Sequence, residues 1–77
     1  MSRVFTDEGL LTWEAYASGG KFGRPERPKV IFNCLSHPGR RARYVILPGD
    51  AADAEQAVLE LTDGRLRDML GSARELD

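Results

Sequence analysis

The chain has 77 residues, one cysteine and a formal net charge of −1. This length predicts a single small domain whose large hydrophobic residues are needed for its core, which argues against a deep substrate pocket. A lone cysteine excludes an internal disulfide and is typical of a reducing compartment. With no signal peptide and no run of about 18 apolar residues, we expect a cytoplasmic protein that does not contact a membrane.

Charge is distributed unevenly along the sequence. Residues 1–20 carry a net charge of −2, residues 21–43 carry +6, and residues 44–77 carry −5. Segregated charge either forms an interaction surface or draws two segments together within the fold. We favour the second arrangement, because an acidic helix beside a basic loop is common in small domains.

Residues 3–18 contain two runs of alternating polar and apolar residues, typical of strands, separated by residues 7–9. Three residues ending in glycine predict a hairpin loop made of a type I turn and a left-handed glycine. Phe5 is then expected opposite Leu11. The alternation puts four apolar residues on one face, and we expect them to begin the core: Phe5, Leu11, Trp13 and Ala15.

A loop is predicted for residues 19–28, where three glycines and two prolines occur in ten residues. A second hairpin is predicted over residues 29–49, with Pro38-Gly39 at the centre of a type II turn. Both faces of this hairpin are mostly apolar, so we expect it to be central in the sheet. The expected cross-strand pairs are Phe32 with Val45 and Cys34 with Arg43.

From residue 50 onward the apolar period becomes that of a helix. Asp50 or Asp53 is expected to cap a first helix, and Thr62 a second one. One helix over residues 52–73 is the alternative, but Gly64 would then lie in mid-helix, so we predict a break near residue 62. Leu61 and Leu66 stand at the staple positions around the second cap, and the apolar stripe of the second helix comprises Leu66, Met69, Leu70 and Ala73.

These elements predict an α+β fold: a small antiparallel β-sheet of about four strands in two hairpins, with one or two C-terminal helices packed on one face. The single domain, residues 1–77, has a sheet part at 1–49 and a helical part at 50–77. The stretches RVFTDEGLLTWEAY and LTDGRLRDML resemble a set of short bacterial proteins of no established activity. Those proteins begin with a Phe-x-Asp hairpin that leads into a tryptophan strand, and they end in a helix capped by Leu-Ser/Thr-Asp. The resemblance implies this fold, and it carries over no functional residue.

Cys34 and His37 are the only cysteine and histidine, three residues apart in the second hairpin. Residues three apart on a strand point to opposite faces. We therefore interpret Cys34 as a buried strand residue and His37 as a solvated turn residue, not as nucleophile and base. A zinc site needs three or four such ligands, and the stretch GGKFG lacks the hydroxyl residue and the helix of a phosphate loop. We expect neither an enzyme nor a bound metal or cofactor.

The sequence is best interpreted as a small non-enzymatic binding or regulatory module that contacts another protein through a charged surface. The alternative is an RNA or single-stranded DNA binding module that uses the basic segment 21–43 together with Phe22 and Tyr44. We disfavour this alternative because alternation along the strand separates the arginines from Tyr44. Homo-oligomer formation is left open. The candidate contact residues are Arg24, Arg27, Arg40, Arg41 and Arg43.

Overall fold

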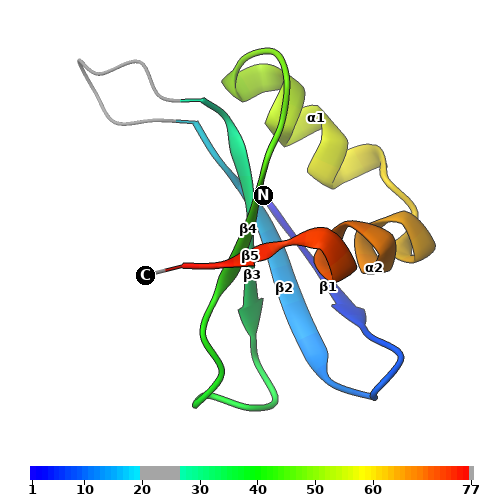
Figure 1. Cartoon of the computed structure of the whole chain (residues 1–77). Coiled ribbons are helices and arrows are strands. Elements are labelled where there is room, and N and C mark those ends of the chain that lie inside the picture. The colour runs from blue at the N-terminus through cyan, green and yellow to red at the C-terminus, as the bar shows by residue number, and fades with distance from the viewer. Residues whose placement is uncertain (20–26, 77) are drawn as a thin grey trace.

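The computed structural model describes residues 1–19 and 27–76. Its strands form one antiparallel sheet in the order β1-β2-β3-β4-β5, and two helices lie between β4 and β5 in the chain (Figure 1). The α+β class and the helix pair are as predicted, whereas the short β5 was not predicted. The elements are β1 (Ser2–Thr6), β2 (Thr12–Ser18), β3 (Lys29–Cys34), β4 (Arg43–Ile46), α1 (Ala51–Glu60), α2 (Asp63–Ser72) and β5 (Arg74–Glu75).

The core lies between one face of the sheet and the two helices. Phe5 is 3% exposed, Trp13 1% and Leu66 0%, so sheet and helices share one core as predicted. The rings of Phe5 and Phe32 meet edge to face with their centroids 5.9 Å apart, a favoured aromatic geometry. Val58 of α1 is fully buried in the same cluster, which fixes the first helix on the sheet.

The first hairpin has the predicted loop type, moved along the chain by one residue. The N–H of Asp7 donates to the carbonyl of Leu11 (2.8 Å), and the left-handed residue is Leu10 (φ 65°) and not Gly9. Phe5 therefore lies opposite Trp13, and the predicted pairing with Leu11 is wrong. The reason is Asp7, whose carboxylate accepts hydrogen bonds from the backbone N–H of Leu11 (2.9 Å) and the indole Nε1 of Trp13 (2.8 Å).

The second hairpin also differs from the predicted register by two residues. Phe32 lies opposite Arg43, and Cys34 lies opposite Trp13 of β2 instead of pairing with Arg43. The N–H of Arg40 donates to the carbonyl of His37 (3.0 Å), so a turn does form around Pro38-Gly39. Gly39 is not among the residues with positive φ, so the turn is not type II.

The cause of this second shift is the end of β3, which is held by β2. The N–H of Leu35 donates to the carbonyl of Thr12 (2.8 Å), and the N–H of Thr12 donates to the hydroxyl of Ser36 (2.9 Å). These bonds replace pairing with β4 beyond residue 32 and leave residues 35–42 as a longer loop than the two-residue turn we predicted.

The starts of the two helices and the break between them agree with the sequence predictions. Asp50 caps α1 in a capping box whose second member is Asp53, and Thr62 caps α2 by accepting from the N–H of Arg65. The chain is extended at Leu61, between the helices, which confirms the predicted break. The predicted stripe of α2 packs against the sheet through Leu66 and Leu70. None of the helices in the described residues is long and apolar enough to cross a membrane.

Candidate functional site

The two helices cover one face of the sheet, and no helix or strand of the described residues covers the opposite face, which we call the open face (Figure 1). One row of residues crosses it in register: Tyr16 of β2, Ile31 of β3 and Tyr44 of β4, each half-buried. Val4 and Ile46 on the same face are 56% and 43% exposed. An apolar and aromatic surface is therefore presented to solvent.

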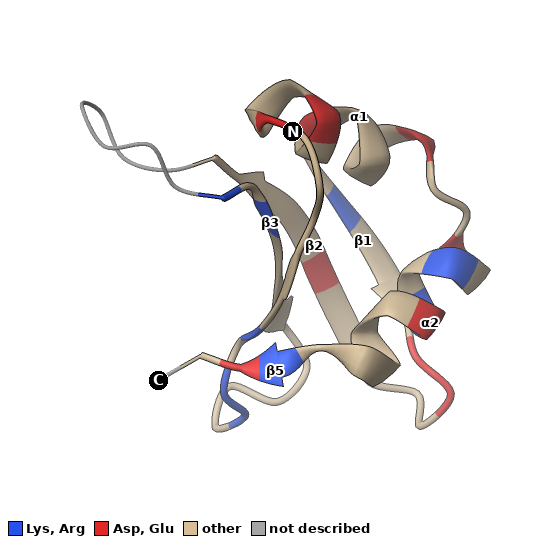
Figure 2. Cartoon of the chain, turned by 45° about the horizontal axis from the view of Figure 1, so that its top comes forward, with Lys and Arg blue, Asp and Glu red and all other residues tan. Residues whose placement is uncertain are grey.

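Basic side chains surround this surface. Lys29 is the strand partner of Ile46, and Arg74 is the strand partner of Tyr44, so both belong to the open face. Figure 2 shows basic residues on β3, on β5 and in the β3–β4 loop. Among the strand residues that the structure describes, Glu14 is the carboxylate on this face, and it accepts a hydrogen bond from the hydroxyl of Ser2 (2.8 Å).

The structure does not bring the predicted arginines together in one patch. Arg24 lies outside the described residues. Arg27 is exposed just before β3, and Arg40 and Arg41 are exposed beyond the other end of that strand. A six-residue strand is about 20 Å long, so these groups border opposite ends of the open face.

Arg43 belongs to the other face of the sheet. Its guanidinium lies 5.6 Å from the centroid of the Trp13 ring, a cation–π distance, and its partner in β5 is Glu75. Arg43 and Tyr44 are thus on opposite faces, as alternation predicts. Two cations outside that prediction, Lys29 and Arg74, do share the face of Tyr44.

Residues 21–43 are basic and residues 44–77 are acidic, and the sequence predicts that these two segments attract each other. The described arginines of the basic segment form no ion pair with the acidic segment. In the described part of the chain the ion pairs join the Met1 amino group to Glu55 (2.9 Å) and Arg3 to Asp63 (2.7 Å). Neither involves an arginine of residues 27–43. Arg40 does interact electrostatically with Asp7 of the first hairpin loop, adding to the hydrogen bond from Trp13 that chiefly lowers the pKa of this carboxyl.

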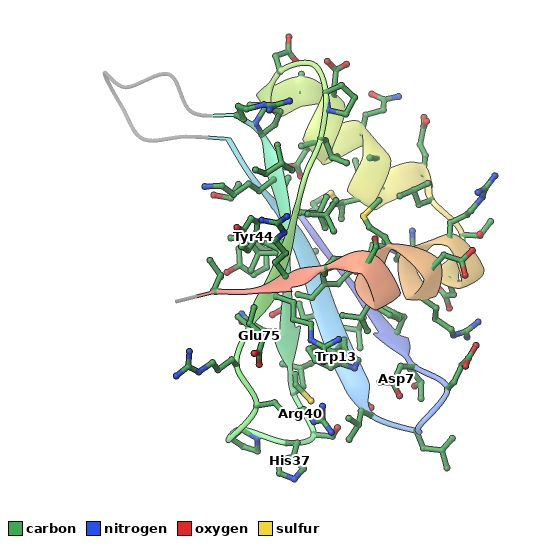
Figure 3. All side chains as sticks on the ribbon, in the orientation of Figure 1. Asp7, Trp13, His37, Arg40, Tyr44 and Glu75 are labelled. Atoms are coloured by element: carbon green, nitrogen blue, oxygen red, sulfur yellow. The ribbon has the colours of Figure 1, made fainter. Side chains whose placement is uncertain are left out.

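Cys34 and His37 are placed as their positions in the sequence suggest. Cys34 is 9% exposed, with its Sγ 3.9 Å from the hydroxyl of Ser36. His37 is exposed at the end of the β3–β4 loop, where Figure 3 also shows Arg40. No hydrogen bond between Cys34 and His37 is present, and the described residues contain no group of three or more side chains arranged to bind a metal.

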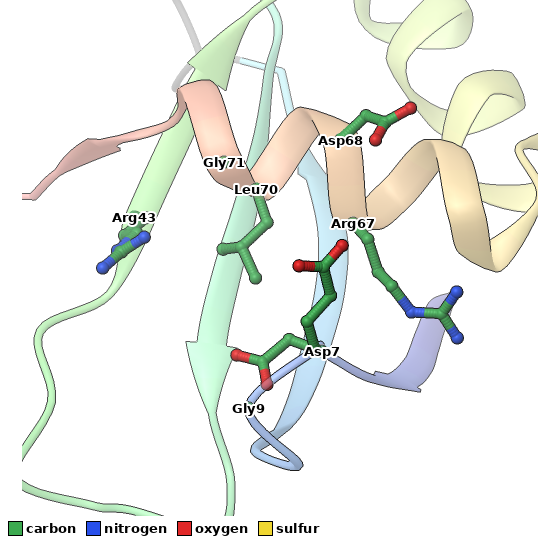
Figure 4. Close-up of a pocket in the computed structure, with 8 residues that line it drawn as sticks. Asp7, Gly9, Arg43, Arg67, Asp68, Leu70 and Gly71 are labelled. Atoms are coloured by element: carbon green, nitrogen blue, oxygen red, sulfur yellow. The ribbon is translucent and has the colours of Figure 1, made fainter.

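A hollow of about 370 Å³ opens on the helix side, between the first hairpin loop, β4 and α2 (Figure 4). Its charges are mixed, and two of them already hold the fold together. Asp7 accepts from Trp13, and this bond is the main cause of a pKa lowered below the usual 3.8, against a smaller effect of burial. The Nε of Arg67 donates to the carbonyl of Thr6 (2.7 Å). Asp7 holds the first hairpin together and Arg67 ties that hairpin to α2, so we assign the hollow a structural role.

Sequence reasoning missed most of the open face. Ile31 and Ile46 alternate with core residues along their strands, a signal that was treated only as evidence for a central hairpin, and the same alternation places Tyr16 on the open face. Arg74 had no such signal, because β5 has only two residues. Neither a family model nor a curated protein nor a solved structure showed significant similarity to the chain, so the proposals below depend on its own residues.

Proposed function

We propose that the chain is a non-enzymatic binding module that contacts an acidic protein partner through the open face of its sheet. The observation that carries this proposal is the row formed by Tyr16, Ile31 and Tyr44 on the sheet face opposite the two helices. Basic residues border the row, and one carboxylate stands on the described strands of that face.

An apolar centre with a charged border is the usual composition of a protein-binding surface. Tyrosine is enriched where interfaces have their largest energetic contributions, because a rigid ring buries much area at little cost in conformational entropy. Tyr16 and Tyr44 are the proposed anchors. Ile46, exposed on the same face, supplies a further apolar contact to the partner. Arg27, Arg40 and Arg41 attract acidic groups and orient the partner before contact.

The alternative partner is single-stranded nucleic acid, and one observation favours it. Tyr44 and Tyr16 share their face with Arg74 and Lys29, which are the parts of a base-stacking surface. The aliphatic side chains of the open face argue for protein. Val4 and Ile46 are half exposed there, and phosphates and bases do not need aliphatic contacts.

The test is a titration of the isotopically labelled protein, followed by NMR, with a short peptide that alternates glutamate and leucine. A peptide with lysine in place of glutamate is the control ligand, and short oligo-dT and oligo-U are titrated in parallel. We expect the acidic peptide to shift the signals of Tyr16, Ile31 and Tyr44, and the lysine peptide to leave them unchanged. Shifts confined to the helices, or equal binding of both peptides, would contradict the proposal.

Two matched variants locate the surface. Ile46 is 43% exposed on the open face, and Leu59 is 44% exposed on α1. Ile46→Ser should weaken peptide binding by about tenfold, because an apolar contact is lost, and Leu59→Ser should not change it. If instead oligo-U binds more tightly than the acidic peptide and Tyr44→Ala removes that binding, the nucleic-acid alternative is correct.

A further inference from the structure

The outer surface of α1 has the chemistry that the open face is proposed to bind. The helix carries Asp53, Glu55 and Glu60 and no lysine or arginine, and Asp50 adds a further carboxylate at its N-terminus. Leu59 is 44% exposed among these acidic residues. An acidic helix with an exposed leucine therefore exists within this chain.

The fold keeps this helix away from the open face of its own molecule. Figure 2 shows acidic residues along α1 on one side of the sheet and basic residues along β3, β5 and the β3–β4 loop. In the described residues, the α1 carboxylate of Glu55 pairs with the Met1 amino group, and Arg27, Arg40 and Arg41 form no ion pair. Within the described residues, the arginines that border the open face therefore form no ion pair with the carboxylates of α1.

We propose that the open face of one copy binds the outer surface of α1 of a second copy. This inference rests on the open face of the proposed function and names a second copy as one acidic partner. A two-fold dimer through two open faces is disfavoured, because it would bring the arginines at the border of each face against one another. Contact between two different surfaces is head to tail, and such contacts can extend into open chains.

Electrostatic attraction sets the expected behaviour. The charges involved are exposed, and exposed charges are screened over roughly 8–10 Å at physiological salt. The association is therefore weak and concentration-dependent, and it falls by about tenfold when salt is raised from low to well above physiological values. Sedimentation velocity over a range of protein concentrations, at low and at high salt, measures this directly.

Charge-reversed variants give the decisive experiment. The sheet-side variant carries Arg41→Glu and Arg74→Glu, and the helix-side variant carries Glu55→Lys and Glu60→Lys. All four positions are exposed or half-exposed at the surface, and circular dichroism checks that both variants are folded. Each variant alone should remain monomeric at concentrations where the unchanged chain associates, because one of its two surfaces now repels the other.

An equal mixture of the two variants should associate again, since each then meets a partner of opposite charge. Association of the unchanged chain that is insensitive to salt, or a mixture that stays monomeric, would overturn the inference. So would an unchanged chain that is monomeric at every concentration and low salt. If that chain still binds the acidic peptide on its open face, the inference fails while the proposed function stands.

Discussion

At the scale of single residues, the most unusual feature is Leu10. It occupies the left-handed region (φ 65°) of the first hairpin loop with 82% of its surface exposed. A residue with a side chain carries a cost of roughly 1–2 kcal/mol there, and glycine does not. The adjacent Gly9 has no positive φ, so the residue suited to this conformation stands one position too early.

We expect Leu10→Gly to raise the free energy of unfolding by about 0.5–1 kcal/mol. Glycine relieves the backbone strain at this position, and its greater conformational entropy in the unfolded chain offsets part of that gain. Gly9→Ala is the matched control. An added Cβ there meets only the Asp7 Oδ1 at 3.5 Å, an ordinary contact, so little change is expected. Urea denaturation measures both. A loss of stability in Gly9→Ala with none gained in Leu10→Gly would place the left-handed residue at position 9.

At the scale of elements, one arginine joins a strand to both helices. Arg3 of β1 places its Nη1 within hydrogen-bond distance of the carbonyls of Val58 (3.1 Å) and Leu61 (2.8 Å), and its Nη2 2.7 Å from the carboxylate of Asp63. The last turn of α1 contains no basic residue of its own. Arg3 therefore satisfies carbonyls that the end of a helix leaves without partners.

Arg3→Met should lower the free energy of unfolding by about 1.5–3 kcal/mol, because charged hydrogen bonds to half-buried carbonyls are lost. Arg3→Lys should recover only part of it, since an ammonium group cannot reach all of these acceptors from one position. Arg65 is the control: it is exposed on α2, and Arg65→Met should change stability by less than about 0.5 kcal/mol. Equal effects of Arg3→Met and Arg65→Met in urea denaturation would refute this role.

The same elements explain how far the sequence can predict the fold. Strand residues alternate between faces, so a register error of two residues, as in both hairpins, leaves every side chain on its correct face. The core was therefore predictable while the pairing was not. The pairing depends on individual side-chain bonds that the alternating pattern does not encode: Trp13 to Asp7 within the first hairpin, and Thr12 to Ser36 between β2 and the end of β3.

At the scale of the whole molecule, the site was harder to predict than the core. Arg27 precedes β3 and Arg40 and Arg41 follow it, so the length of that strand separates them. Arg74 reaches the open face only because α2 leads the chain back to β4. Proximity of this kind arises from topology and not from spacing along the sequence. The acidic character of α1, in contrast, follows directly from the sequence, because all charged residues of this helix are carboxylates.

The integrity of both surfaces depends on one small core, and Leu66 is its link to α2. It is fully buried, and it packs in the cluster that contains Trp13 and Phe32. Leu66→Ala leaves a cavity between helix and sheet and should lower the free energy of unfolding by about 2–5 kcal/mol, a large fraction of the total for a domain of this size.

Leu59→Ala makes the same chemical change at a position that is 44% exposed, so it should cost far less. Trp13, the only tryptophan and 1% exposed, reports unfolding through its fluorescence in a urea titration. A Leu66→Ala midpoint equal to that of Leu59→Ala would mean that α2 does not pack on the sheet in solution. Val58 would still hold α1 on the sheet, but Arg74, which follows α2 in the chain, would have no fixed place on the open face, and head-to-tail association would lose part of its basic surface.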